Sequence, residues 1–74
     1  MVNERQFGRQ LALLRREAGC TQDEFAGRLH VSPQAVSKWE NGHSLPETAL
    51  LPELARLLGV SIDALFNPGD LLIH

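Results

Sequence analysis

The sequence predicts an all-α fold in which five short helices form one small domain. Apolar residues recur three or four positions apart, which is the spacing of one face of a helix. Residues with β-branched side chains are few, so the composition gives little support to strands. With 74 residues, the chain has room for one domain.

The first predicted helix covers residues 4–18 and ends at Gly19, a residue type that commonly terminates helices. Its apolar stripe consists of Phe7, Leu11 and Leu14. Leu13 lies off this stripe, and we expect it to be an isolated surface leucine.

The second and third helices are predicted from their capping residues. Thr21 and Glu24 have the spacing of a capping box, in which each side chain satisfies a free backbone N–H at the start of a helix. Ser32 suits the N-cap of the next helix and Pro33 its first position. This third helix should run to the Asn41-Gly42 pair. The inward residues of the second helix are Phe25, Ala26 and Leu29.

Two further helices are predicted after a loop at residues 43–51, of which residues 47–50 could form a turn. Pro52 suits the first turn of a fourth helix that ends at Gly59. Ser61 suits the N-cap of a fifth helix. The apolar residues of that fifth helix are Ile62, Leu65 and Phe66.

The two helix junctions repeat one another, because residues 29–32 read Leu-His-Val-Ser and residues 58–61 read Leu-Gly-Val-Ser. His30 stands where the second junction has a glycine. Glycine is favoured where φ is positive. The repeat therefore predicts a positive φ at His30, a conformation that His tolerates better than most residues do.

The formal net charge of −2 argues at first against a nucleic-acid partner. The charge is divided unevenly, however, because residues 1–43 carry +1 and residues 44–74 carry −3. The total charge is therefore a poor guide to the first 43 residues, which contain the second and third helices.

Cys20 is the single cysteine, so an internal disulfide is impossible and a reducing compartment is expected. We interpret Cys20 as a small buried hydrophobe. No apolar run approaches the roughly 20 residues of a membrane span, and the N-terminus lacks the apolar core of a signal peptide. These features predict a cytoplasmic protein.

About three residues separate the second helix from the third, so the two helices must meet at a steep angle, as in a helix-turn-helix. At about 100° per residue, the third helix has an inward face and an outward, polar face. The inward face contains Val36, Trp39 and Glu40; the outward face contains Gln34, Lys38 and Asn41. Gln can pair with adenine, and Lys can reach guanine or phosphate. The alternative is an ordinary solvated helix face.

The residues at these positions resemble a known family. Thr21, Gln22 and Ala26 begin the pattern, and Trp39-Glu40-Asn41-Gly42 ends its central part. The likeness continues through residues 42–46 and 57–66 and covers roughly residues 5–66. The sequence is similar to the Cro/C1-type (XRE family) helix-turn-helix of phage repressors and bacterial transcriptional regulators.

The resemblance implies a compact five-helix, lambda-repressor-like DNA-binding domain that works as a homodimer on an operator with two-fold symmetry. It implies that Gln22 and the start of the second helix bind phosphate. The positions that match the base-reading part of the third helix are Pro33, Gln34, Ser37 and Lys38. Ser32, the N-cap of that helix, is also expected among the DNA-binding residues. Asn41 matches a residue that anchors the DNA backbone, and His43 in the following loop is expected near phosphate.

Glu40 has a structural interpretation and a functional one. Its place beside Val36 and Trp39 favours a structural role, because a carboxylate at the edge of an apolar face needs a partner. The resemblance supplies Arg15 as that partner, in an ion pair between the first and third helices. Trp39 is expected in the core rather than on the DNA-facing side.

Other functions have less support in the sequence. No paired nucleophile and base, phosphate-binding glycine loop or metal cluster is present, so neither an enzyme nor a cofactor is expected. The three histidines lack the spacing of metal ligands. A protein-interaction or antitoxin-type subunit with the same fold remains the alternative. We divide the chain into a helix-turn-helix domain, residues 1–66, and a tail, residues 67–74, that either forms a dimer, covers the core or starts a linker.

Overall fold

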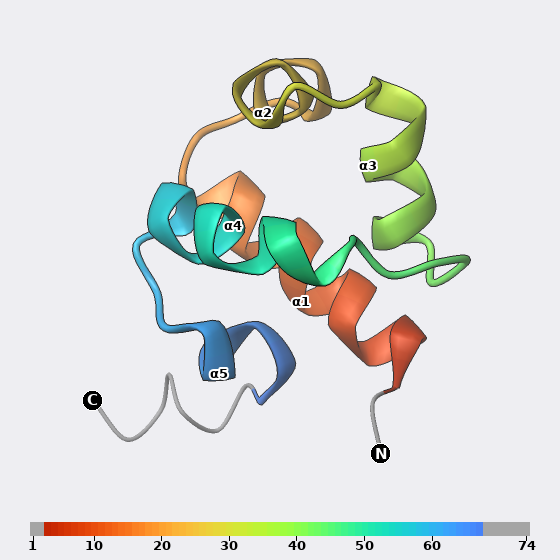
Figure 1. Ribbon diagram of the computed structural model, residues 1–74, viewed down its shortest axis with the longest axis vertical. Coiled ribbons are helices and arrows are strands. Elements are labelled where there is room, and N and C mark those ends of the chain that lie inside the picture. The colour runs from red at the N-terminus through yellow and green to blue at the C-terminus, as the bar shows by residue number, and fades with distance from the viewer. Residues whose placement is uncertain (1–2, 68–74) are drawn as a thin grey trace.

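The computed structural model describes residues 3–67, and Figure 1 shows how its helices are arranged. Within this range every regular element is helical, which confirms the predicted all-α fold. The elements, in order, are α1 (Glu4–Glu17), α2 (Gln22–Leu29), α3 (Pro33–Glu40), the 3-10 turn η1 (Thr48–Leu50), α4 (Leu51–Leu58) and α5 (Ile62–Phe66). None of these helices is long and apolar enough to span a membrane.

The helix α1 forms the centre of the fold, with α2 and α3 at one end of the molecule and α5 at the other (Figure 1). Its inward residues Phe7 and Leu11 are almost completely buried, as the helical spacing predicts. The other core residues come from every α-helix: Leu14, Phe25, Ala26, Leu29, Val36, Trp39, Leu54, Ala55 and Leu65. Burying each of the large side chains stabilises the fold by about 1.5–3 kcal/mol.

The helix ends agree with the predicted caps. The Thr21 side chain accepts a hydrogen bond from the Glu24 N–H, and the Glu24 carboxylate accepts one from the Thr21 N–H. These bonds lower the pKa of Glu24. Ser32 and Ser61 accept from the N–H groups three residues ahead, at 3.1 Å in both cases. The caps are local, so each follows from a few neighbouring residues.

The repeated junction is present at both places. His30 and Gly59 are left-handed C-caps with φ of 59° and 71°. The N–H of the residue after each cap donates to a carbonyl five residues earlier, from Val31 to Ala26 and from Val60 to Ala55. His30 is the one non-glycine residue with positive φ among residues 3–67. The prediction from the repeat is confirmed.

The burial of three apolar residues at the ends or the surface of helices can be compared with expectation. Ile62 is exposed, whereas the buried residues of the short helix α5 are Ala64 and Leu65. Cys20 is half-buried rather than buried, although it packs against the core. Leu13 is exposed, as predicted. The tail predicted for residues 67–74 lies outside the described residues apart from Asn67.

Candidate nucleic-acid interface

The left-handed turn at His30 and the cap at Ser32 join α2 to α3 at a steep angle, and together they form a helix-turn-helix (Figure 1). Val36 and Trp39 bury one side of α3 in the core, with 0% and 5% of their surfaces exposed. Both α1 and α2 pack against α3. The orientation of α3 is therefore fixed by packing on two neighbouring helices.

The opposite side of α3 is polar and exposed. Pro33, Gln34 and Lys38 are exposed, whereas Ser37 and Ala35 are half-buried. We call Gln34, Ser37, Lys38 and Asn41 the α3 polar row. Neither Gln34 nor Lys38 makes a side-chain hydrogen bond or ion pair within residues 3–67. Both side chains are free to bind an external ligand.

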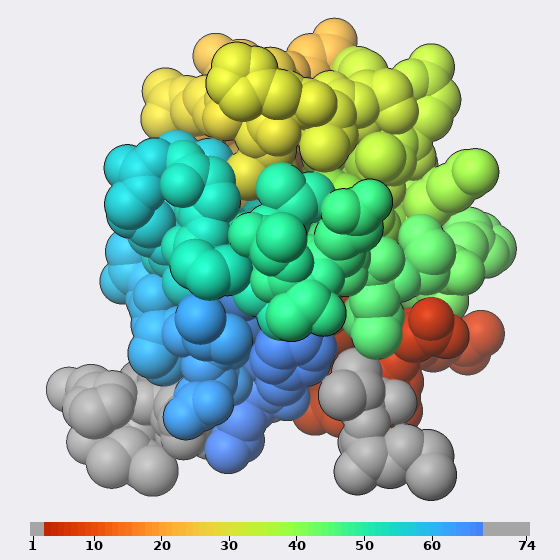
Figure 2. Space-filling model, viewed as in Figure 1, coloured from red at the N-terminus to blue at the C-terminus, as the bar shows by residue number. Residues whose placement is uncertain are grey.

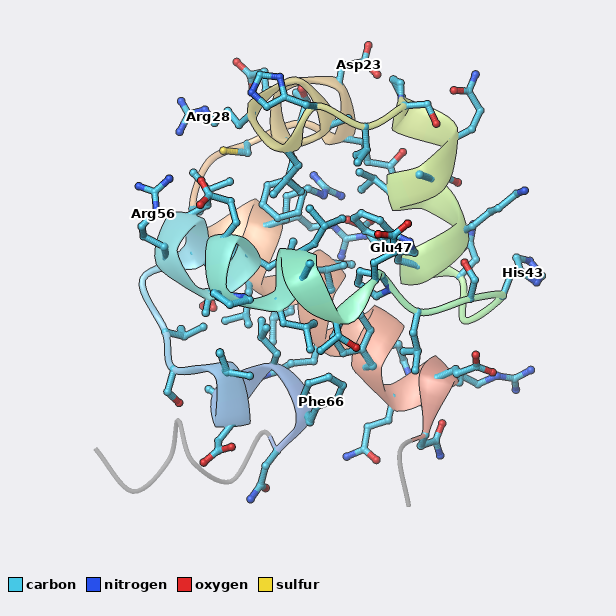
Figure 3. All side chains as sticks on the ribbon, in the orientation of Figure 1. Asp23, Arg28, His43, Glu47, Arg56 and Phe66 are labelled. Carbon is cyan, nitrogen blue, oxygen red and sulfur yellow. The ribbon has the colours of Figure 1, made fainter. Side chains whose placement is uncertain are left out.

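The last turn of α3 contains a hydrogen-bonded pair. The Asn41 Nδ2 donates to the Ser37 Oγ at 3.2 Å. The Asn41 N–H also donates to the Ser37 carbonyl at 3.0 Å, so Asn41 closes the helix. Beyond it, His43 is exposed at the edge of the molecule (Figure 3). The Ser32 hydroxyl is already used as the N-cap acceptor for Ala35.

A buried polar network forms around Glu40, the last residue of α3. The Arg15 Nε donates to the Glu40 Oε2 at 2.6 Å, and the Arg15 Nη2 donates to the Glu40 Oε1 at 3.1 Å. The side chains are 10% and 5% exposed, respectively. The hydrogen bonds from Arg15 to Glu40 raise the pKa of the guanidinium despite its burial. This is the ion pair that the resemblance implied, and it ties α1 to the end of α3.

Gln22 joins the same network. Its Nε2 donates to the Glu40 Oε1 at 2.9 Å. An ionised carboxylate only accepts hydrogen bonds, so the amide nitrogen must face Glu40. The second N–H of the amide is then available to a ligand at the start of α2. Sequence reasoning placed Gln22 beside phosphate but did not find its bond to Glu40, because the two residues are 18 positions apart.

Gly8 is a positioning residue that the sequence analysis missed. A Cβ at this position would lie 2.3 Å from the Trp39 carbonyl oxygen and 2.7 Å from that of Glu40. The backbone of α1 therefore lies directly against the C-terminal end of α3. A signal was available, since glycine in a helix interior costs about 1 kcal/mol relative to alanine and so needs a packing reason.

The comparison with protein families matches residues 11–65 to a model described as helix-turn-helix. The chain belongs to this Cro/C1-type family. The matched range of the helix-turn-helix protein contains α2, the turn, α3 and the network around Glu40. The resemblance seen in the sequence is confirmed.

Curated relatives of this helix-turn-helix protein have names that refer to transcription. It is 44% identical to the uncharacterized HTH-type transcriptional regulator y4dJ of Sinorhizobium fredii, over 85% of this chain and 82% of that protein. It is 34% identical to the HTH-type transcriptional activator BcrR of Enterococcus faecalis. It is 38% identical to the 26 kDa repressor protein of Escherichia phage HK022. The chain spans about a third of the length of BcrR and of the phage repressor.

Solved structures give the same fold. The clp gene regulator ClgR from C. glutamicum has a TM-score of 0.79 and 27% identity, over 89% of this chain and 85% of that chain. Hydroxypropylphosphonic acid epoxidase from S. wedmorenis has a TM-score of 0.80 and 29% identity. The match covers 36% of the epoxidase chain. The likeness to this enzyme is thus confined to about a third of its chain.

Proposed function

We propose that this protein is a transcriptional regulator that recognises a specific sequence in double-stranded DNA by placing α3 in the major groove. The observation that carries the proposal is the α3 polar row, in which Gln34, Lys38 and Asn41 are exposed while the opposite side of the same helix is packed in the core. A rigid helix with one free polar face is what base recognition in the major groove requires. The family membership and the names of the relatives support the same function.

We assign the base contacts to Gln34 and Lys38, whose side chains are free and separated by one helical turn. Pro33 has no N–H and no polar side chain, so it contributes shape or contact with a thymine methyl group. Ser37 is half-buried and bonded to Asn41, and we assign it a supporting contact. These assignments follow from the residue types and their exposure.

Phosphate contacts are assigned to groups around the C-terminal end of α3. Gln22 has an amide N–H free at the start of α2, where the helix dipole also favours an anion. Asn41 follows Glu40 directly at the same end of α3, and His43 lies in the loop beyond it. Such contacts fix the register of the protein on the duplex without reading its sequence.

We further propose that two copies bind an operator with two-fold symmetry, with half-sites about 34 Å apart. Repression by occupying a promoter is the sign of regulation we favour, because a phage repressor is among the relatives. A regulator of this kind works beside the DNA in the cytoplasm. The alternative, a protein-interaction subunit, has less support because α3 exposes no aromatic or large aliphatic side chain that could anchor a partner.

The experiment that tests the function is selection of bound sequences from a random DNA pool at a stated salt concentration. We expect a short, two-fold-symmetric sequence to be enriched. Binding of the enriched duplex should exceed binding of an unrelated duplex by about 10³-fold or more. Enrichment of no sequence would refute specific recognition.

A further inference from the structure

The loop after α3 packs directly against the first turn of α1. Gly42 has a φ of 77°, and a Cβ there would lie 2.9 Å from the Arg5 Cα and 3.3 Å from the Arg5 Cβ. Figure 2 shows the same proximity, with the red atoms of the start of α1 beside the green atoms of this loop at one edge of the molecule. Arg5 therefore lies next to the C-terminal end of the helix that we place in the groove.

Arg5 has no structural role that the fold explains. Its side chain is exposed and makes no hydrogen bond or ion pair within residues 3–67. It occupies the first turn of α1, where the positive end of the helix dipole disfavours a cation. The neighbouring acid, Glu4, is exposed and does not pair with it. A cation that is unfavourable for its own helix and has no partner among residues 3–67 is suited to an external anion.

Arg5 lies beyond the C-terminal end of α3, beside Gly42. The helix α3 ends at Glu40, and Gly42, with its positive φ, lies two residues beyond that end. The eight residues of α3 rise by about 12 Å, and the major groove is about 12 Å wide. The first residues of a recognition helix contact the bases. A group just beyond the last turn therefore meets the sugar-phosphate wall of the groove rather than a base.

We propose that Arg5 binds a backbone phosphate of the operator beside the C-terminal end of α3. This inference rests on the proposed DNA-binding function and adds a residue to it. The contact supplies affinity that is independent of sequence, because a phosphate carries no base information. It has unusual weight in this protein, since a net charge of −2 leaves few cations to displace counterions from DNA.

The test compares the salt dependence of DNA binding in variants of the full chain. Arg5→Ala, Arg5→Lys and Arg28→Ala are titrated against the selected operator and an unrelated duplex over a range of salt concentrations. Arg28 is the matched control, because it is exposed and lies on the opposite side of the molecule from His43 (Figure 3). Thermal unfolding of each variant checks that the fold is retained.

A plot of log K against log salt concentration has a negative slope. Loss of one phosphate contact makes this slope less negative by about 0.9 for each bound subunit. We expect Arg5→Ala to show this smaller salt dependence on both duplexes while its sequence preference stays unchanged. Arg5→Lys should restore the wild-type slope, and Arg28→Ala should behave like the wild type. If wild-type protein binds the operator but Arg5→Ala behaves like Arg28→Ala, the inference is wrong and the function stands. If the wild type binds both duplexes equally well and Arg5→Ala still shows a less negative slope, the proposal of sequence-specific recognition is wrong and the phosphate contact of Arg5 stands. No binding to any duplex would overturn both.

Discussion

The Glu40 carboxylate at the end of α3 accepts two hydrogen bonds from Arg15 of α1, with N–O distances of 2.6 and 3.1 Å. Both side chains are nearly inaccessible to solvent. Removing one partner of such a pair leaves the other charge buried without compensation. We therefore expect Glu40→Ala to lower the free energy of unfolding by about 3–5 kcal/mol in the absence of DNA. Urea or thermal denaturation of the DNA-free protein measures this loss.

The chain offers a matched control for this prediction. Glu53 and Arg56 of α4 also form an ion pair, but both side chains are well exposed. Glu53→Ala should cost no more than about 1 kcal/mol. If Glu40→Ala and Glu53→Ala lower the free energy of unfolding by the same amount, the Arg15–Glu40 pair does not support the fold.

Gln22 tests whether the same network orients a DNA contact. Gln22→Met keeps the length of the side chain but removes the amide that bonds Glu40. Since Arg15 still satisfies Glu40, the free energy of unfolding should change by less than about 1 kcal/mol. Loss of the phosphate contact should weaken binding to any duplex by about tenfold, as expected for a hydrogen bond to a charged group. Unchanged affinity in a titration with operator DNA would remove Gln22 from the interface.

Gln34 and Lys38 test the assignment of base contacts. Alanine at either position should cost about 1–3 kcal/mol of binding free energy on the selected operator and relax the preference at one or two base pairs. The affinity for unrelated DNA should fall less. A repeat of the sequence selection with the double variant measures the effect, and full retention of the wild-type preference would contradict the assignment.

Gly8 tests the close approach of α1 to α3. Gly8→Ala places a methyl group against the backbone carbonyls of Trp39 and Glu40, which are not the ends of flexible side chains. The helices must separate, at a cost of about 1–3 kcal/mol in unfolding free energy. The control is Gly27→Ala in α2, where the added Cβ meets nothing within 4 Å. This control should be stabilising by about 0.4–1 kcal/mol, and destabilisation of the same size in both variants would exclude the proposed clash.

The two repeated junctions allow a reciprocal test of backbone strain. His30 has a φ of 59° and Gly59 a φ of 71° at equivalent C-caps. His30→Gly should raise the free energy of unfolding by up to about 1 kcal/mol, whereas Gly59→Ala should lower it by about 1 kcal/mol or more. Chemical denaturation measures both changes. Destabilisation by His30→Gly would mean that the imidazole makes a favourable interaction that offsets its strained backbone.

Much of the fold was predictable because its determinants are local. Thr21, Ser32 and Ser61 each cap a helix through a bond to an N–H three residues away. The inward positions of Val36 and Trp39 follow from helical spacing alone. The exposed face of α3 was predictable for the same reason, since it is the side of the helix opposite these two residues.

The extent of burial near the ends of the domain was harder to predict. Ile62 is apolar and follows a helix cap, yet it is exposed, while Cys20 is only half-buried. Helical spacing gives the direction of a side chain relative to its own helix. It does not tell whether another element covers that direction, which depends on how the ends of several helices meet.

The sequence by itself determined where each helix begins and ends, which side of α3 is polar and which family the pattern resembles. The helix ends and the polar side of α3 depend on residues within about one or two helical turns of one another, and the family resemblance depends on the order of residues along the chain. The tertiary structure alone decided that Gln22 bonds to Glu40, that Gly8 contacts the end of α3 and that Arg5 lies beside Gly42. These contacts join residues 18 to about 37 positions apart, and their geometry depends on the angles at which α1, α2 and α3 pack.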